Sequence, residues 1–447
     1  MLESWQAAVA LTVFVAVIAL VALEWVHLTI AALLGALLLV VLNILTPDQA
    51  IGYIAKSHAT LALFLGVMIM VRAFQPTKVF EYLATQMVIL AKGQGKRLLL
   101  GIVAVTTPIC AVLPNATTVM LLAPLLPPLA EELEVDCVPL LILLVFVANS
   151  SGLLTLVGDP ATFIVGTSIN MSFMDYLTTL SLGGAVAVAV IVATLPFLFK
   201  KIWRKELADL DHLPRPQINH PRMLLLGSVI VAMVLFCFAV GEMLPVPIAP
   251  ATAALLGAGL CLLLAHHGKI DSVNHILRDV DWSTLLFFMS IFVLIGGLQQ
   301  TGVISQLSVA LAIVLGQNIA LGAIVLLFTI GLLSSVVPNI PLVVAMVPLL
   351  QEYLLTVGLV TPEMLGPNAT VALPAVVMPL FYAMMYGATL GGNGTLVGAS
   401  ANIVAAGIAE QYGRSISFKR FLYYGLPTMG LQLVVLALYV GIRFLRV

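Results

Sequence analysis

Long apolar runs, repeated along the whole chain, are the feature that most constrains its fold. Apolar residues make up 62 % of the 447 positions, charged residues 9 %, and mean hydropathy is +1.16. A soluble domain is about 45–50 % apolar and about 25 % charged, so this chain could not cover its surface with polar groups in water. A bilayer removes that need, and backbone in lipid must satisfy its own hydrogen bonds. The sequence therefore predicts an all-α polytopic membrane protein.

Twelve segments are candidates for membrane crossing, which needs about 20 mostly apolar residues. They are 7–23, 27–45, 59–74, 98–130, 138–167, 179–199, 223–241, 250–266, 283–300, 318–357, 371–409 and 424–443. The segments 98–130 and 318–357 contain Pro-Asn and are interpreted as re-entrant hairpins. The segments 138–167 and 371–409 contain Gly-rich polar breaks and are interpreted as broken helices. The prediction is about ten crossings plus the two hairpins.

The basic residues predict the orientation, because loops rich in Lys and Arg stay in the cytoplasm. The densest cluster lies in 200–222, which we place inside. With the Pro-Asn segments as hairpins, 15 of the 19 basic residues come out inside. The exceptions are Arg72 at the inner boundary and, on the outer face, Lys56, Arg443 and Arg446. We expect a plasma-membrane protein (inner membrane if bacterial) with its N-terminus outside.

The two halves of the chain repeat one another. Pro114-Asn115 recurs as Pro338-Asn339, 224 positions later, and Leu156-Val157-Gly158 recurs as Leu396-Val397-Gly398, 240 positions later. The predicted topology runs the halves in opposite directions, which gives inverted repeats over 1–222 and 223–447, with 200–222 as a cytoplasmic linker. The first hairpin would enter from the inside and the second from the outside. Inverted repeats with broken helices are typical of secondary transporters.

The Pro-Asn pairs predict hairpin tips that could coordinate an ion. Proline starts each break and leaves backbone groups that need partners. Asn115 offers a donor and an acceptor, and Thr117 and Thr118 add hydroxyls. Its repeat mate Asn339 lacks such threonines, so the two tips differ chemically. The alternative role for Asn115 is to cap the following helix, which is compatible with ion binding.

The first broken helix adds a carboxylate to the predicted site. Its polar or flexible positions are Asn149, Ser151, Thr155 and Gly158. Asp159 is the only carboxylate that the topology places well inside a span, which makes it a functional-site candidate. Pro160 interrupts the helix there, so Asp159 could bind Na⁺ or take up a proton. The alternative is that Asp159 caps a helix beginning at Pro160.

The second broken helix carries the densest group of small and polar residues. They are Gly392, Asn393, Gly394, Thr395, Ser400 and Asn402. Glycines unwind a helix and expose backbone groups to a bound ion. Close helix packing is the alternative, but it does not account for the amides and hydroxyls. The candidate Na⁺ contacts are therefore Asn115, Asp159, Asn339 and Asn393.

Other classes of site are not indicated. The four cysteines lie in or beside apolar segments without metal-ligand spacing, and no nucleophile–base arrangement lies near Asp159 in sequence. We expect no cofactor and no enzymatic activity. The basic residues are scattered over loops, which argues against nucleic acid. The expected partners are a small ionic substrate and the lipid bilayer.

The motifs resemble a known group of transporters. The stretch from Leu390 to Asn402 is similar to the signature of arsenite-efflux and NhaD-type permeases of the ion transporter superfamily, to which the melanosomal P protein belongs. Gly158-Asp159-Pro160 resembles the same group. The resemblance implies an elevator-type fold, in which a transport domain holds the hairpins and broken helices, and often a homodimer. More distantly the chain resembles divalent-anion:sodium symporters, whose Ser-Asn-Thr tips bind Na⁺ and substrate. Asn115 and Asn339 match that Asn, whereas prolines replace the Ser.

These observations predict a secondary active transporter of an inorganic or small organic anion, an oxyanion or a metalloid such as arsenite. Transport would be coupled to Na⁺ or H⁺. A Na⁺/H⁺ antiporter is the main alternative, and an anion channel is a further one. No single residue selects the substrate or the direction of transport.

Overall fold

The computed structural model describes residues 4–23, 25–206, 217–365 and 371–445. The regular elements in these ranges are helices, and one isolated bridge joins Gln94 and Glu206. Nine helices in the described ranges are long and apolar enough to cross a membrane, or up to ten if one bent pair is a single span. The prediction of an all-α multi-pass membrane protein is therefore confirmed.

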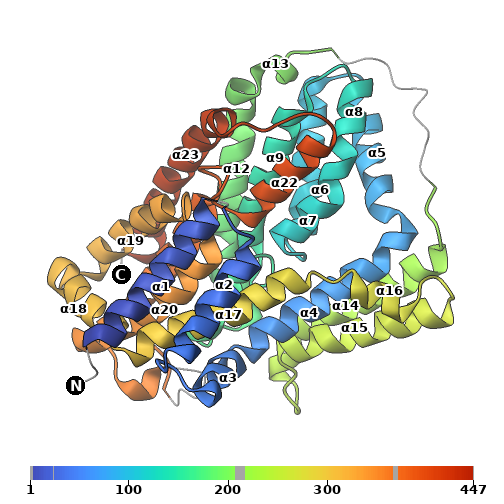
Figure 1. Ribbon diagram of the computed structural model, residues 1–447. Helices are drawn as coiled ribbons and strands as arrows, with labels where there is room; N and C mark the ends of the chain where they lie inside the picture. The colour runs from blue at the N-terminus through green and yellow to red at the C-terminus, as the bar shows by residue number, and fades with distance from the viewer. Residues whose placement is uncertain (1–3, 24, 207–216, 366–370, 446–447) are drawn as a thin grey trace.

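Eight helices form a framework of crossed pairs beside the rest of the molecule. They are α1 (Ser4–Ala22), α2 (Leu28–Val41), α3 (Pro47–Lys56), α4 (His58–Phe74), α14 (Pro221–Val240), α15 (Pro250–His267), α16 (Val273–Arg278) and α17 (Trp282–Gln300). Helix α4 packs on α15, and α2 packs on α17. A Cβ at Gly66 would lie 2.6 Å from the carbonyl carbon of Ala254, so a glycine is required where α4 crosses α15. Figure 1 shows α4, α14, α15 and α16 lying together, away from α7 and α9.

The first Pro-Asn segment forms a hairpin whose two ends meet on one side. It comprises α6 (Gly95–Cys110), α7 (Asn115–Leu122) and α8 (Leu126–Glu132). The backbone N–H of Gly95 donates to the carbonyl of Lys205 at 3.0 Å, and the Lys205 ammonium donates to the carbonyl of Glu134. One residue therefore ties the start of the hairpin to its end, so the chain turns back instead of crossing.

The second Pro-Asn segment is a hairpin made by α19 (Ile319–Ser334) and α20 (Asn339–Thr356). The Tyr353 hydroxyl donates to the Gly316 carbonyl, and the Gln317 amide donates to the Val357 carbonyl, each at 2.8 Å. In Figure 1, α8 at the base of the first hairpin lies near the top, whereas α18 at the base of the second lies at the lower left. The two hairpins thus enter from opposite ends of the molecule.

The two broken helices interrupt at the predicted places. The first runs from α9 (Cys137–Ser151) through a short 3₁₀ turn (Gly152–Leu154) to α10 (Pro160–Ser168), and the second from α21 (Met378–Gly391) to α22 (Ser400–Gln411). Helix α10 packs against α20 and α22 packs against α7, so each hairpin contacts the broken helix of the other half. The long helices α12 (Ser181–Leu198) and α23 (Phe418–Phe444) lie alongside, and the short α11 (Phe173–Thr179) and α13 (Lys200–Trp203) flank α12.

Equivalent positions of the two halves make equivalent contacts. The Thr155 hydroxyl donates to the Ala111 carbonyl, and the Thr395 hydroxyl donates to the Ser335 carbonyl. Both threonines and both acceptors are related by the same offsets as the sequence motifs. The exact limits of the predicted repeats, 1–222 and 223–447, stay a prediction, and residues 207–216 of the linker lie outside the described ranges.

Two short helices that precede the hairpins were not predicted from the sequence. They are α5 (Val79–Ala91) and α18 (Val303–Leu315), and α18 meets α19 at 117°. Each lies directly before the hairpin of its own half. A search for long apolar runs does not find them, because polar residues interrupt each one and neither is long enough to cross alone.

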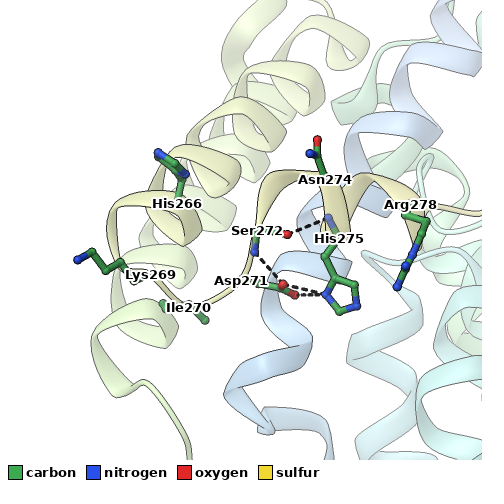
Figure 2. A pocket seen from close by; sticks show the side chains of 8 residues that line it. All are labelled: His266, Lys269, Ile270, Asp271, Ser272, Asn274, His275 and Arg278. Carbon is green, nitrogen blue, oxygen red and sulfur yellow. Dashed lines mark hydrogen bonds and ion pairs between the residues drawn. The ribbon is translucent and has the colours of Figure 1, made fainter.

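A charged cluster pins α4 to the loop around α16. Arg72 Nη2 lies 2.7 Å from the Asp279 carboxylate and 3.4 Å from that of Asp271, and the Arg72 side chain is only 11 % exposed. His275 Nδ1 lies 2.8 Å from Asp271 Oδ1 (Figure 2). Hydrogen bonds from Arg72 hold the pKa of the Asp279 carboxyl below its ordinary value.

Replacing Arg72 by Gln should therefore lower the melting temperature of the detergent-solubilised protein at pH 7. Because the pKa of Asp279 is lowered in the folded state, its stabilising effect is present at neutral pH and is lost as the pH falls through the folded-state pKa. The gap in melting temperature between wild type and Arg72→Gln should shrink below about pH 4. Arg278→Gln is the control, since its side chain is 74 % exposed and reaches Asp279 only at 3.6 Å. Equal melting temperatures for wild type and Arg72→Gln would contradict the assignment.

Candidate substrate and ion site

Asn149 joins three of the four predicted motifs. Its Oδ1 accepts a hydrogen bond from Asn115 Nδ2 at 3.0 Å. Its Nδ2 donates to Asn393 Oδ1 and to Asn402 Oδ1, both at 3.1 Å. All four side chains are at least 95 % buried. The first hairpin tip and both broken helices therefore meet at one amide in the interior.

The remaining atoms of this amide cluster also have partners. Asn402 Nδ2 donates to the carbonyls of Gly392 at 2.7 Å and Thr395 at 2.9 Å, which satisfies backbone freed by the break. Asn393 Nδ2 donates to Gln432 Oε1 at 2.9 Å and to Ser150 Oγ at 3.1 Å. Buried amides with several partners each are held in fixed rotamers, so the cluster is rigid.

Gln432 connects this cluster to the long helices around it. It lies on α23, its side chain is fully buried, and its Nε2 donates to Ser150 Oγ at 2.9 Å and to the Ala187 carbonyl of α12 at 3.0 Å. The sequence analysis missed Gln432, although an amide inside the predicted span 424–443 was a visible signal of the kind that identified Asp159.

Asp159 forms a second group that links the halves. Its Oδ2 accepts from the Thr389 hydroxyl at 2.6 Å, and its Oδ1 lies 3.4 Å from Asn339 Nδ2 at the second hairpin tip. The carboxylate is fully buried. It stands at the N-cap position of α10, as the alternative interpretation expected, but its side chain makes no capping hydrogen bond. Its oxygens instead accept from Thr389 and Asn339 of the other half. Thr389, on α21, was not among the predicted site residues.

The hairpin tips differ from the prediction by one residue. Pro114 and Pro338 occupy the N-cap positions, so Asn115 and Asn339 are the first residues of α7 and α20. The alternative prediction, that Asn115 caps the following helix, is therefore wrong, because Pro114 occupies the N-cap position. The Oδ1 of Asn115 accepts from the adjacent Ala116 N–H at 2.8 Å, and its Nδ2 is free to reach Asn149. Proline fixes φ before the helix and has no N–H to bury.

The other predicted residues lie around these two groups. Thr155 and Thr395 tie the unwound segments to the hairpins, and Ser151 donates to Thr107 on α6 at 3.2 Å. Thr118 is buried within the first hairpin, and Thr117 is half-buried. Neither threonine is part of the amide cluster.

The glycines of the breaks allow close contact with the hairpins. A Cβ at Gly158 would lie 2.7 Å from the carbonyl oxygen of Cys110, and one at Gly394 would lie 2.8 Å from Ser335 Cβ. Gly392 faces Ala399, where a Cβ–Cβ distance of 3.1 Å would result. Packing thus explains part of the glycine pattern, as the alternative interpretation held.

A cavity of about 280 Å³ opens between the second hairpin tip and the framework. Its polar lining consists of His27, Thr284, Asn339 and Ser400. The apolar wall includes Phe287 and Phe288 of α17. His27 and Thr284 belong to the framework, whereas Asn339 and Ser400 begin helices α20 and α22. Of the predicted residues, Ser400 and Asn339 line this cavity. The sequence analysis had assigned no site role to His27.

The first hairpin tip faces a cavity of similar size but different chemistry. This cavity of about 270 Å³ lies between Val112 and Leu113 of the tip and helices α4 and α14. Ser228 is its only residue with a polar side chain, and the other lining residues carry hydrocarbon or thioether side chains. A polar solute would find partners at the second tip and hardly any at the first.

Within the described residues, no group of three His, Cys, Asp or Glu side chains comes together as a metal site. The oxygens at Asp159 are its own carboxylate and the Thr389 hydroxyl, and Asn339 presents its amide nitrogen. Oxygen ligands suit a hard cation better than a transition metal.

Comparison with known proteins places the chain among transporters. The family model described as "Citrate transporter" matches residues 18–372. An uncharacterized transporter of Synechocystis sp. is 66 % identical over 441 residues, which cover 99 % of this chain and 98 % of that protein. An uncharacterized transporter of Mycobacterium tuberculosis is 33 % identical, with 98 % of each chain covered. The human P protein is 29 % identical over 95 % of this chain and 58 % of its own length.

Two solved structures share the fold at low sequence identity. The Alcanivorax borkumensis YdaH transporter superposes with a TM-score of 0.57 and 13 % identity, covering 88 % of this chain and 86 % of that one. Neisseria gonorrhoeae MtrF, described with a class of antimetabolite efflux pumps, gives a TM-score of 0.54 and 13 % identity, covering 92 % and 85 %. At this identity the likeness concerns the fold alone.

Replacing Gln432 by Met should destabilise the protein without changing its helical content. The substitution removes the acceptor of Asn393 Nδ2 and the donor to Ser150 Oγ and the Ala187 carbonyl. The cost is about 1–3 kcal/mol for each buried group left unpaired. Thermal unfolding in detergent would measure the loss. Gln299→Met, at an exposed position of α17, is the matched control. A Gln432→Met protein as stable as this control would show that the amide cluster does not depend on Gln432.

Proposed function

This chain belongs to the citrate transporter family, and from that premise we propose that it couples the movement of a small anion to a gradient of Na⁺ or H⁺. It is a secondary transporter and a multi-pass membrane protein. The observation that carries the proposal is the cavity at the second hairpin tip, lined by an amide, two hydroxyls and an imidazole. Among the described residues, no Lys, Arg, Asp or Glu lines it, so binding would rest on the amide, hydroxyl and imidazole groups and the ends of two helices.

Helix ends give this cavity its preference for anions. Asn339 begins the 18-residue helix α20, and Ser400 begins the 12-residue helix α22. The first N–H groups of a helix lack intrahelical acceptors, and the helix dipole adds partial positive charge there. Two such ends at one cavity favour an anion without a fixed positive charge.

We assign the coupling cation to the group around Asp159. The carboxylate lies directly behind the cavity, since Asn339 both lines the cavity and contacts Asp159. A Na⁺ ion or a proton at Asp159 would neutralise a buried charge and let Asn339 turn its amide towards the anion. Cation and anion binding would thereby be linked through one side chain.

The framework and the hairpins would move relative to one another during transport. His27 and Thr284 are on the framework, and the other polar lining residues are on the hairpin and broken-helix helices. Such movement would separate the two sets and open the site to the other side. The charge-derived topology puts His27 near the cytoplasm, and on that basis we assign the conformation as inward-facing.

Proteoliposomes containing wild type or Asn339→Ala would test this function. The solutes would be citrate, arsenite and chloride, each with an imposed Na⁺ or pH gradient. We expect uptake of one solute to follow one cation gradient. Asn339→Ala should slow it by about tenfold or more, because Asn339 lines the cavity and losing a hydrogen bond to a charged ligand costs roughly 1.5–3 kcal/mol.

A variant at the cation site serves as the control for coupling. Asp159→Asn keeps the shape of the side chain but removes its charge, so we expect solute exchange to persist while the dependence on the cation gradient disappears. Exchange of Na⁺ for H⁺ without any solute would favour the antiporter, for which the buried Asp159 is the supporting observation. Flux that follows only the solute's own gradient would indicate a channel.

His27 should contribute a hydrogen bond to the solute from the framework side. Its Nδ1 faces the Thr29 N–H at 3.3 Å and caps α2, which leaves Nε2–H as the donor available to the cavity. His27→Asn keeps the capping acceptor and removes the Nε2 donor, whereas His27→Gln keeps a donor at similar reach. We expect His27→Asn to raise the KM for uptake by about tenfold at unchanged melting temperature, and His27→Gln to raise it less. An unchanged KM in His27→Asn would remove His27 from the site.

A further inference from the structure

A groove runs along the outer face of the framework between α14 and α15. It has a volume of about 400 Å³ and is lined by Leu226, Val229 and Ile230 from α14 and by Leu260, Leu263 and Leu264 from α15. Val229 is 59 % exposed and Leu263 is 53 % exposed. On both helices the lining residues follow the spacing of a single helical face. The groove is therefore apolar and open.

Basic residues gather at one end of this groove. A Cβ at Gly257 would lie 2.5 Å from a methyl of Val234, which fixes how the antiparallel helices α14 and α15 align. Arg222 precedes Val234 by 12 residues and Lys269 follows Gly257 by 12 residues. In antiparallel helices this equal spacing places Arg222 beside Lys269, which lies just after the end of α15. His267 lines the groove at the same end. All three side chains belong to exposed residues.

The basic region continues around the last turn of α15 into a surface pocket. Figure 2 shows His266 and Lys269 on the α15 side of this pocket and Arg278 on the far side, along α16. The two carboxylates nearby, Asp271 and Asp279, already contact Arg72. Arg72 balances one of these two negative charges, and Arg278 lies 3.6 Å from Asp279. Arg222 and Lys269 are therefore the basic residues left to attract an anion from outside.

We propose that this end of the framework binds an anionic phospholipid. One acyl chain lies in the groove, and the phosphate contacts Arg222 and Lys269, with His267 beside it. The charge distribution of the sequence places this end at the cytoplasmic face, where anionic headgroups attract basic residues. A guanidinium and a phosphate pair through two parallel hydrogen bonds. The site should prefer an anionic lipid because the ammonium group of a zwitterionic lipid offsets its phosphate charge and is repelled by Arg222 and Lys269.

The same charges argue against a second copy of the chain as the occupant. A twofold axis along the membrane normal would set this face against itself with both copies at the same height. Arg222 and Lys269 of one copy would then face the same residues of the other, and like charges across an interface are unfavourable. A soluble phosphate could bind at the basic end, but it would leave the apolar groove unoccupied, so it fits the site less well than a lipid.

Native mass spectrometry would test the site on the full-length protein released from nanodiscs that contain equal amounts of phosphatidylglycerol and phosphatidylcholine. We expect wild type to retain phosphatidylglycerol at least about fivefold over phosphatidylcholine, as one favourable charge contact predicts. The double variant Arg222→Gln/Lys269→Gln should lose this preference. Lys200→Gln/Lys201→Gln removes two exposed basic residues elsewhere on the same predicted face and should keep it.

A second variant separates the lipid from other occupants. Leu263→Trp fills the groove without changing charge and should reduce retention of phosphatidylglycerol. Glycerol 3-phosphate, which has the headgroup phosphate but no chains, should not displace the lipid. Equal retention in the two double variants, displacement by glycerol 3-phosphate, or a change of oligomeric state in Leu263→Trp without loss of lipid would each overturn the proposal.

Discussion

Every break in a membrane helix exposes backbone groups that only the protein itself can satisfy, and this constraint organises the whole interior. The hydroxyls of Thr155 and Thr395 each donate to a carbonyl of a hairpin. Asn402 donates to two carbonyls of its own broken segment. Unwound backbone can therefore persist at the centre of the molecule, where a solute or ion can reach it.

The two halves have the same backbone arrangement but differ in the side chains near their hairpin tips. The threonine–carbonyl bonds are the same in both, but Asp159 of the first broken helix corresponds to Ala399 of the second. The first hairpin tip faces an apolar cavity and the second faces a polar one. The repeats thus give a symmetric arrangement of helices. A few differences in sequence place both the carboxylate and the polar cavity at the second hairpin tip. In the proposed mechanism, that asymmetry would let a cation and an anion occupy neighbouring positions without competing.

The framework contributes more than support. It supplies His27 and Thr284 to the polar cavity, and its charged cluster around Arg72 fixes α4 against the loop that carries α16. Its outer face combines an apolar groove with a basic end. A framework held in place by ion pairs and lipid would give the hairpins a fixed surface to move against.

The sequence by itself determined the membrane class, the spans, the two Pro-Asn hairpins and the places where two helices break, because hydropathy, proline and glycine act locally along the chain. It also identified Asn115, Asn149, Asn393 and Asn402, since amides inside apolar spans need partners. It could not determine which partners they have: Asn149 meets Asn402 across 253 positions. Gln432, Thr389 and His27 take their roles only from helices that the fold brings beside them. Polar contacts between distant segments depend on helix packing and register, and those were decided by the tertiary structure alone.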